Sequence, residues 1–230
     1  MNTISVVIPV LDGAKYLAAA IDSVLAQTDP PDEVIVAIDQ GTTDASAAIA
    51  GSYGGCVATV PVRAFSGTCA SLNAGIAAAR GAYLCFLDAD DLWLPDKLAV
   101  QRAAFAARPE LDAVFTRIRQ FLSDDLPADL ASRLACPAEP MSGVAKQTMM
   151  IRRTAFDRVG AFDETLRHVD FIDWYARATE ARLVMQVIDA VVVLRRIHAA
   201  NWGIRMRDGQ RAENIVALKR ALDRRRERAK

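Results

Sequence analysis

Three carboxylates stand close together in the middle of the chain. Asp88, Asp90 and Asp91 fall within four residues, directly after the apolar run at residues 83–87, and the next lysine or arginine is Lys97. Two like charges about 5 Å apart repel by ~3 kcal/mol at an effective dielectric constant of 20. A divalent cation would relieve that repulsion, because Mg²⁺ commonly binds one or two carboxylates together with substrate phosphates. The spacing therefore predicts a cation site, and the alternative is that one of the acids only caps the following helix.

The acidic loop follows the fourth of several alternating strand and helix patterns. Apolar, β-branched runs predict strands at residues 4–10, 33–38, 57–64 and 83–87, and helical spacing predicts helices at 14–27, 44–50, 68–79 and 95–107. Such alternation predicts an α/β fold with a mostly parallel central sheet and helices on both faces. Ligands bind beyond the carboxyl ends of such strands, so we expect the site in loops 11–14, 39–43 and 88–93.

The pattern is less regular beyond residue 112. Strands are expected at residues 113–121, 146–152 and 183–194, and helices at 154–159, at 170–181 and from about 210. Residues 123–140 contain three prolines and scattered acids, and they predict a long irregular excursion. Loops of that length are often functional.

Composition argues against several classes of partner. The 28 lysines and arginines balance the 28 aspartates and glutamates, so nothing favours nucleic acid. The four cysteines lack CxxC spacing and are expected to be buried free thiols. No signal-peptide pattern opens the sequence and no apolar run reaches the ~18 residues of a membrane span, so a soluble cytoplasmic protein is expected. The basic segment 224–230 is interpreted as a solvated helix face, with peripheral membrane or protein contact as the alternative.

The same loop carries a family signature. The run FLDADDLW, preceded by NAGIAAARGAYLC, resembles the DxD segment of family 2 glycosyltransferases, and residues 4–44 resemble their N-terminal half-site. The resemblance is dense over residues 3–100 and thinner toward the end. It implies a GT-A fold in one domain at 1–230, with a nucleotide-sugar donor half at 1–110 and an acceptor half with a C-terminal helix at 111–230. The implied reaction is hexosyl transfer from a nucleotide diphosphate donor, most often a UDP-sugar in this family, to an unidentified glycan, lipid, peptide or small-metabolite acceptor.

The resemblance also assigns the donor site by position. Asp39 would hydrogen-bond the base, Asp88 would contact the ribose region, and Asp90 would hold Mn²⁺ or Mg²⁺ on the diphosphate. The family usually has asparagine or glutamate at Asp12 and aspartate at Gln40, and these departures bear on the base contacts. The full predicted nucleotide-sugar set is Pro9, Val10, Asp12, Asp39, Asn73, Asp88, Ala89 and Asp90.

Residues 149–178 resemble the acceptor-side stretch of the family, in which an acid at the start of a helix is the general base. Aligned by position, Asp170 is the predicted catalytic base and Asp173, one turn later, the second candidate; the alternative makes Asp170 a helix cap and Asp173 a surface acid. The run RRIHAANWG at residues 195–203 resembles the segment that closes the site. It implies His198 as a metal ligand opposite Asp90 and either Arg195 or Arg196 facing the diphosphate, against the alternative of a packed strand-end histidine.

Two other functions use the same residues. A metal-dependent phosphohydrolase or nucleotidyltransferase would suit the acidic loop, but dehalogenase-like phosphatases carry their nucleophile after the first strand, not the fourth. A catalytically weakened sugar-nucleotide binding protein is favoured by Gln40 and Phe171 and opposed by Asp88, Asp90 and Asp170. The sequence is therefore interpreted as an inverting, metal-dependent glycosyltransferase that acts by single displacement.

Overall fold

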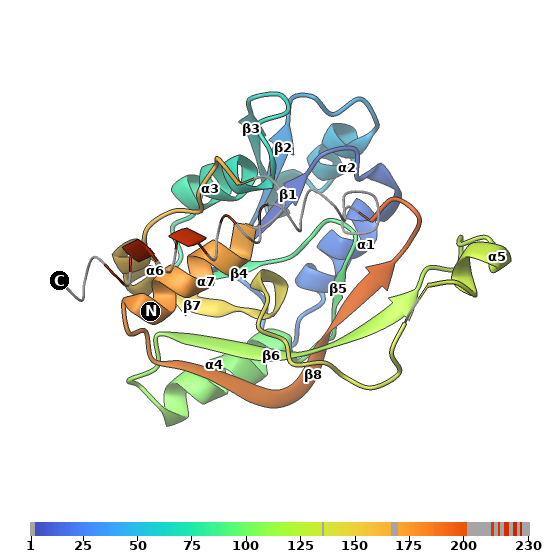
Figure 1. Cartoon of the computed structure of the whole chain (residues 1–230). Coiled ribbons are helices and arrows are strands. Elements are labelled where there is room, and N and C mark those ends of the chain that lie inside the picture. The colour runs from blue at the N-terminus through green and yellow to red at the C-terminus, as the bar shows by residue number, and fades with distance from the viewer. Residues whose placement is uncertain are drawn as a thin grey trace.

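A computed structural model describes residues 3–134, 136–166 and 170–201, together with residues 213, 216, 219, 220, 223, 224 and 226. Its centre is an eight-stranded sheet with the order β3-β2-β1-β4-β7-β6-β8-β5 (Figure 1). The strands are β1 (Ile4–Val10), β2 (Glu33–Asp39), β3 (Val57–Val62), β4 (Tyr83–Phe86), β5 (Leu92–Trp93), β6 (Ala113–Leu122), β7 (Met150–Arg152) and β8 (Met185–Ile197).

The first four strands form a parallel unit. β1 pairs with β2 on one side and β4 on the other, and β2 pairs with β3, all in parallel. Every residue of β1 is buried, because helices cover both faces of the sheet, and this explains why the strand is continuously apolar. The carboxyl ends of these strands therefore lie along one edge, where the three predicted loops begin.

The second half of the sheet is mixed. β7 is antiparallel to both β4 and β6, whereas β8 runs parallel to β6 and then pairs antiparallel with β5 (Figure 1). The strand predicted at residues 146–152 is divided: Lys146–Thr148 form a 3₁₀ turn and the strand begins at Met150. β5 was not predicted, because it lies inside the segment 88–93 that was predicted as a loop.

Helices pack on both faces of the sheet, as predicted. α1 (Ala14–Leu25), α2 (Ser46–Ser52) and α4 (Lys97–Ala107) share one apolar cluster with the side chains of Ile4, Val6 and Ile8. α3 (Thr68–Ala78), α6 (Arg153–Val159) and α7 (Asp170–Glu180) share the other cluster, which contains Val7. Alternate residues of β1 thus point into two separate cores. The excursion at residues 123–140 contains one short helix, α5 (Ala128–Ala131).

Two expectations about the surface need correction or comment. Cys69 and Cys85 are buried free thiols as predicted, but Cys56 is exposed, because it ends the surface 3₁₀ turn Gly54–Cys56. Arg224, in the predicted basic C-terminal helix, is half-buried and pairs with Glu180 at 3.0 Å, whereas Arg226 is exposed, so Arg224 itself is packed and not part of a solvated face. Within the described residues, no helix has the length and hydrophobicity that a membrane span requires.

Candidate active site

The three acids of the loop after β4 occupy different environments. A side-chain oxygen of Asp88 lies 3.2 Å from the Lys146 ammonium group. Asp91 is buried, and its Oδ1 accepts a hydrogen bond from the backbone N–H of Arg196 at 2.9 Å. Burial, reinforced by the negative charges of Asp90 and Asp88, raises the pKa of Asp91 well above its ordinary value. Asp91 therefore ties the loop to β8, and Asp88 and Asp90 are the more accessible pair.

The end of β8 brings His198 to the acidic loop. Its Nε2 lies 2.9 Å from Asp90 Oδ2, and the Asn201 side-chain amide donates to the same oxygen at 3.2 Å. The contact arises because β5, directly after the acids, pairs with β8 through Leu92 and Leu194. β8 thus reaches the acidic loop between β6 and β5, and it does not lie beside β4. Asn201 stands in the run that signals the site, but its side chain was not predicted to take part.

Arg196 and Tyr16 surround this contact. The Arg196 guanidinium lies between the rings of Tyr16 and Phe121, at 4.6 and 4.7 Å from their centroids, and its Nε donates to the backbone carbonyl of Asp90 at 3.1 Å. The Tyr16 ring also packs against the His198 imidazole, with centroids 4.7 Å apart. Arg196, one of the two arginines considered for the diphosphate, thus holds the backbone of the acidic loop. Tyr16 is a site residue that the sequence pattern did not indicate.

The geometry of Asp90 and His198 suits a divalent cation. Ligands at 2.0–2.1 Å in adjacent positions of an octahedral ion are about 3 Å apart, close to the 2.9 Å between Asp90 Oδ2 and His198 Nε2. The described part of the chain contains no cluster of three or more histidine, cysteine or acidic side chains that could hold a metal. A cation bound here would therefore take its remaining ligands from substrate phosphates and water, which is how Mg²⁺ is commonly bound.

The predicted base-binding residues lie at the ends of β1 and β2. Asp39 is buried, and its Oδ1 accepts hydrogen bonds from the backbone N–H groups of Gly41 and Phe65 at 2.8 and 2.7 Å. Asp12 has a positive φ of 50° and accepts from the Thr43 N–H at 2.7 Å, so it joins the two loops. Both carboxylates thus organise the backbone along this edge of the sheet.

Three other predicted donor-site residues have packing contacts. Pro9 and Val10 are the last residues of β1 and are buried. Ala89 packs against the apolar cluster below the acidic loop. A Cβ placed on Gly13 would lie 3.4 Å from the Cβ of Ala89. The turn after β1 and the acidic loop therefore touch, and the predicted donor loops converge on one place.

Asn73 links the two halves of the chain. Its amide nitrogen donates to the Phe162 carbonyl and to Glu164 Oε1, both at 2.9 Å, and its oxygen accepts from the Phe162 N–H at 3.0 Å. Asn73 thus anchors the segment before α7 on α3. Its predicted contact with the nucleotide sugar stays a prediction.

The two candidate bases stand at the start of α7. Asp170 is the first residue of the helix, and its side chain lies outside the described part of the structure. Asp173 is buried, with Oδ2 2.8 Å from Arg177 Nε and Oδ1 3.3 Å from Arg224 Nη1. The alternative that made Asp173 a surface acid is therefore wrong. Trp174 is fully buried and stacks on Phe156.

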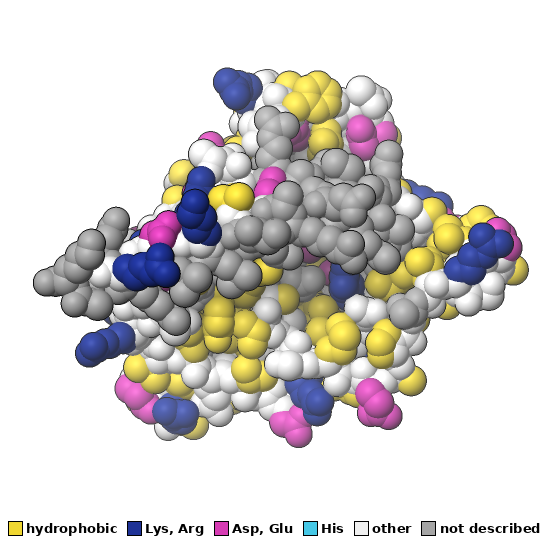
Figure 2. Space-filling view, in the orientation of Figure 1, with side chains coloured by type: hydrophobic (Ala, Val, Ile, Leu, Met, Phe, Trp, Pro, Cys, Tyr) yellow, Lys and Arg dark blue, Asp and Glu magenta, His cyan; other side chains and the backbone are white. Residues whose placement is uncertain are grey.

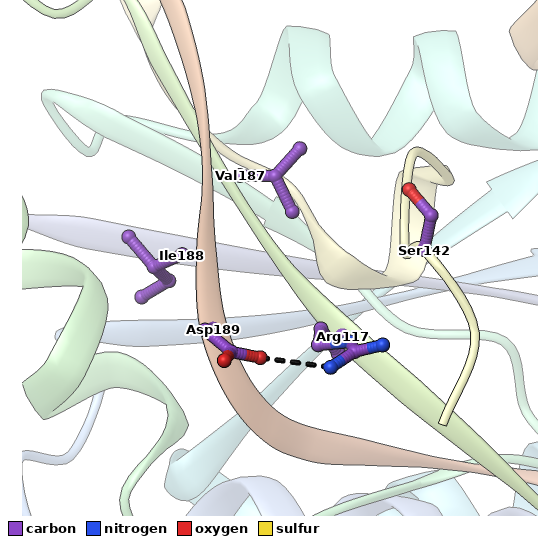
Figure 3. Close-up of a pocket in the computed structure, with 5 residues that line it drawn as sticks. All are labelled: Arg117, Ser142, Val187, Ile188 and Asp189. Carbon is purple, nitrogen blue, oxygen red and sulfur yellow. Dashed lines mark hydrogen bonds and ion pairs between the residues drawn. The ribbon is translucent and has the colours of Figure 1, made fainter. Parts of the chain in front are cut away.

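Two cavities lie away from these residues. One, of about 140 Å³, is formed between β6 and β8 around the Arg117–Asp189 ion pair of 2.9 Å (Figure 3). The other, of about 320 Å³, lies near the amino-terminal end of β4 and is lined by Arg80, Arg152 and Arg153 among others. Neither is lined by a predicted site residue.

The structure resembles solved glycosyltransferases. A mannosyltransferase, PcManGT from Pyrobaculum calidifontis in complex with GDP-Man and Mn²⁺, matches with a TM-score of 0.70 at 20% identity, covering 96% of this chain and 64% of that one. S. aureus TarS 1–349 in complex with UDP-GlcNAc matches with a TM-score of 0.69 at 18% identity, covering 86% and 60% of the two chains. These likenesses confirm the predicted GT-A fold.

Sequence comparison leads to the same family. An uncharacterized glycosyltransferase of Rickettsia prowazekii is 29% identical over 216 residues, which cover 86% of this chain and 64% of the relative. Chondroitin synthase of Pasteurella multocida is 25% identical over 230 residues, 97% of this chain and 23% of the synthase. The chain thus spans less than two thirds of the length of these relatives. The family model for glycosyl transferase family 2 matches residues 5–163, from β1 through the acidic loop to the turn after α6, and the chain belongs to that family.

Proposed function

We propose that the protein transfers a sugar from a nucleotide diphosphate donor, a UDP-sugar by expectation, to an acceptor hydroxyl, with inversion and with a divalent cation. The observation that carries the proposal is the meeting of Asp90 and His198, 2.9 Å apart, at the edge where the parallel strands end. Two structural relatives with the same fold are described in complex with donors, one with UDP-GlcNAc and one with GDP-Man and Mn²⁺, which supports the assignment of the donor class.

The donor half supplies recognition and charge. In the proposal, Asp39 hydrogen-bonds the base of the nucleotide and Asp88 contacts the ribose region. Asp90 and His198 bind Mn²⁺ or Mg²⁺. The cation would offset the negative charge that develops on the departing diphosphate. Arg196 keeps the Asp90 backbone in place through its 3.1 Å hydrogen bond, and Asn201 orients the Asp90 carboxylate. This prearrangement means that little reorganisation is required when charge develops.

The acceptor half supplies the base. In the proposal, the Asp170 carboxylate takes the proton of the acceptor hydroxyl while that oxygen bonds to the anomeric carbon, and the bond from the anomeric carbon to the diphosphate oxygen breaks on the opposite face. We favour Asp170 over Asp173 because both oxygens of Asp173 already accept hydrogen bonds from Arg177 and Arg224. Asp173 is then a residue that holds α7 in place.

The first test is Asp90→Ala, with Asp189→Ala as the control for loss of one surface carboxylate. Calorimetry should show that Mn²⁺ tightens UDP binding to the wild type and to the control, and that this tightening falls by more than about tenfold in Asp90→Ala. His198→Ala should weaken Mn²⁺ more than Mg²⁺, because imidazole suits the softer ion better. An Mn²⁺-dependent UDP affinity that is unchanged in Asp90→Ala would refute the cation site. A wild type that binds UDP but transfers no sugar would favour the alternative of a sugar-nucleotide binding protein.

A further inference from the structure

Phe65 has an unusual combination of exposure and backbone conformation. Its side chain is 66% exposed, more than any other large hydrophobic side chain in the described part of the chain, and its φ is +54°. A left-handed backbone is rare for a bulky residue and costs about 1–3 kcal/mol. Because the ring is mostly exposed, burial of its apolar surface offsets little of this conformational free energy. The folded protein on its own therefore gives no reason for this ring to be here.

The surroundings of Phe65 are those of the predicted base site. Its backbone N–H donates to Asp39 Oδ1 at 2.7 Å, and the same oxygen accepts from the Gly41 N–H at 2.8 Å. The ring lies against Gly41 so closely that a Cβ on that glycine would come within 2.6 Å of the ring Cε1. Asp39, Gly41 and Phe65 thus form one unit, and the carboxylate fixes where the ring stands.

The unit leaves one carboxylate oxygen for a ligand. No described residue donates a hydrogen bond to Asp39 Oδ2, while Oδ1 has two donors. In the strand order β3-β2-β1, Phe65 follows β3, Asp39 ends β2, and Leu11, which is 43% exposed, follows β1. Apolar side chains are exposed over the loops at the ends of β2 and β3, at the top of Figure 2. A carboxylate flanked by exposed apolar groups suits a flat ring that has a polar edge.

We propose that Phe65 is a base-contacting residue of the donor site, with its ring packed on the face of the nucleobase whose edge is bound by Asp39. This inference rests on the proposed function, and it adds Phe65 to the donor site with a role different from that of Asp39. Asp39 recognises the hydrogen-bonding edge of the base, whereas Phe65 supplies affinity through stacking, which tolerates any base because every base has an aromatic face. Phe65 makes no contribution to binding of the diphosphate.

The proposal is tested by comparing a ligand that has a base with one that lacks it. Calorimetry with Mn²⁺ measures UDP and inorganic pyrophosphate against the wild type, Phe65→Asn, Phe65→Trp and the remote control Val187→Ala. Asparagine tolerates the left-handed backbone, so Phe65→Asn removes the ring and keeps the turn. Phe65→Asn should weaken UDP by roughly 5- to 100-fold and leave pyrophosphate unchanged, while Phe65→Trp and Val187→Ala should keep UDP affinity.

The outcomes separate this inference from the function on which it rests. Undiminished UDP affinity in Phe65→Asn, beside a wild type that binds UDP, overturns the role of Phe65 and leaves the proposed function intact. An equal loss for UDP and pyrophosphate also overturns it, because the ring would then act on the whole loop and not on the base. A wild type that binds neither ligand overturns the proposed function, and the inference with it.

Discussion

Neighbouring residues of one chemical type have separate roles in this site. Asp90 Oδ2 faces His198 and Asn201, whereas Asp91, the next residue, is buried against the backbone of Arg196. In α7, Asp173 is likewise held by two arginines. Burial and partners, and not residue type, decide which carboxylates are left for chemistry.

Substitution of the two acids of α7 should separate catalysis from stability. Asp170→Asn should lower turnover by roughly 10² to 10⁴ and leave UDP affinity and the melting temperature unchanged, because it removes only a proton acceptor. Asp173→Asn should lower the free energy of unfolding by about 1–3 kcal/mol, because two half-buried arginine side chains lose the charge of their carboxylate partner. Turnover assays and urea unfolding measure both effects. The reverse pattern would make Asp173 the base.

At the scale of elements, close contact between helix and sheet positions the site. Gly75 of α3 faces Val7 of β1, and a Cβ on that glycine would come within 2.4 Å of a Val7 methyl group. In α2, by contrast, a Cβ on Gly51 would meet no atom within 4 Å. Close packing against β1 therefore requires a glycine at Gly75, whereas no contact requires one at Gly51.

This difference gives a matched pair of substitutions. Gly75→Ala should destabilise the protein by about 1–3 kcal/mol, because α3 must move away from the sheet. Gly51→Ala should stabilise it by about 0.5–1 kcal/mol, because alanine is the better helix former and has room. Chemical unfolding of both variants is the measurement. If Gly75→Ala proved as stable as Gly51→Ala, the close packing of α3 on β1 would be disproved.

A buried lysine makes the stability of α4 depend on pH. Lys97 is fully buried, donates to Gln101 Oε1 at 2.8 Å and lies 3.8 Å from the centroid of the Trp93 ring. Burial lowers the pKa of Lys97 from 10.5 to about 8, and burial also raises the pKa of its neighbour Cys85 to about 11. Between about pH 8 and pH 10.5, Lys97 is protonated in the unfolded chain but neutral in the folded protein, so the free energy of unfolding rises with pH. Below about pH 8 the folded protein must bury a charged lysine, and its stability is lowest there.

The test compares the wild type with Lys97→Met across that range. The wild type should gain on the order of 2–3 kcal/mol relative to the variant as pH rises from about 7.5 to 10.5. Both proteins contain Cys85, so its ionisation largely cancels. Urea unfolding at each pH gives the difference, and a difference that stays constant with pH would show that Lys97 is not desolvated.

The sequence predicted the first half of the fold well because its strands and helices are long and periodic. β1 to β4 and the helices between them have the expected order, since parallel units depend on local patterns. β5 has two residues, too few for a pattern, and β7 forms only the last three residues of the strand predicted at 146–152; the pairing of both depends on distant segments. The meeting of Asp90 and His198 depends on β5 and β8, so spacing alone did not determine it.

Side-chain roles were harder to predict than strands. Tyr16 and Asn201 enter the site through the direction in which they point, which no local pattern records. Phe65 falls between the strand predicted at 57–64 and the helix predicted at 68–79, and only its positive φ and its exposure distinguish it. The acids of the loop, by contrast, were evident because three like charges in four residues require an explanation.

At the scale of the whole molecule, segments far apart in the sequence hold the site together. Asn73 joins α3 to the segment before α7, and β4 pairs with β7 across the two halves. A ligand bound at the proposed site, between Asp39 and the Asp90–His198 pair, would contact segments that are far apart in the sequence. Binding should thus be coupled to global stability.

Thermal unfolding measures that coupling. UDP at about 100 times its dissociation constant, with Mn²⁺, should stabilise the protein by ~2.7 kcal/mol and raise the melting temperature by roughly 5–10 °C. Mn²⁺ alone should have a smaller effect, because the proposed cation site offers it two protein ligands. In Asp90→Ala the addition of Mn²⁺ to UDP should give no further increase. A melting temperature that UDP with Mn²⁺ leaves unchanged in the wild type would contradict donor binding.

The return of β8 has a consequence for how the protein is made. Asp90 and His198 are separated by 108 positions in the sequence, and the strand that joins them begins only at Met185. On the ribosome, the segment from β1 to β4 is translated well before β7 and β8, with which the sheet is completed. Its acidic loop emerges long before its histidine partner. The growing polypeptide is therefore expected to carry no completed centre until His198 has been added.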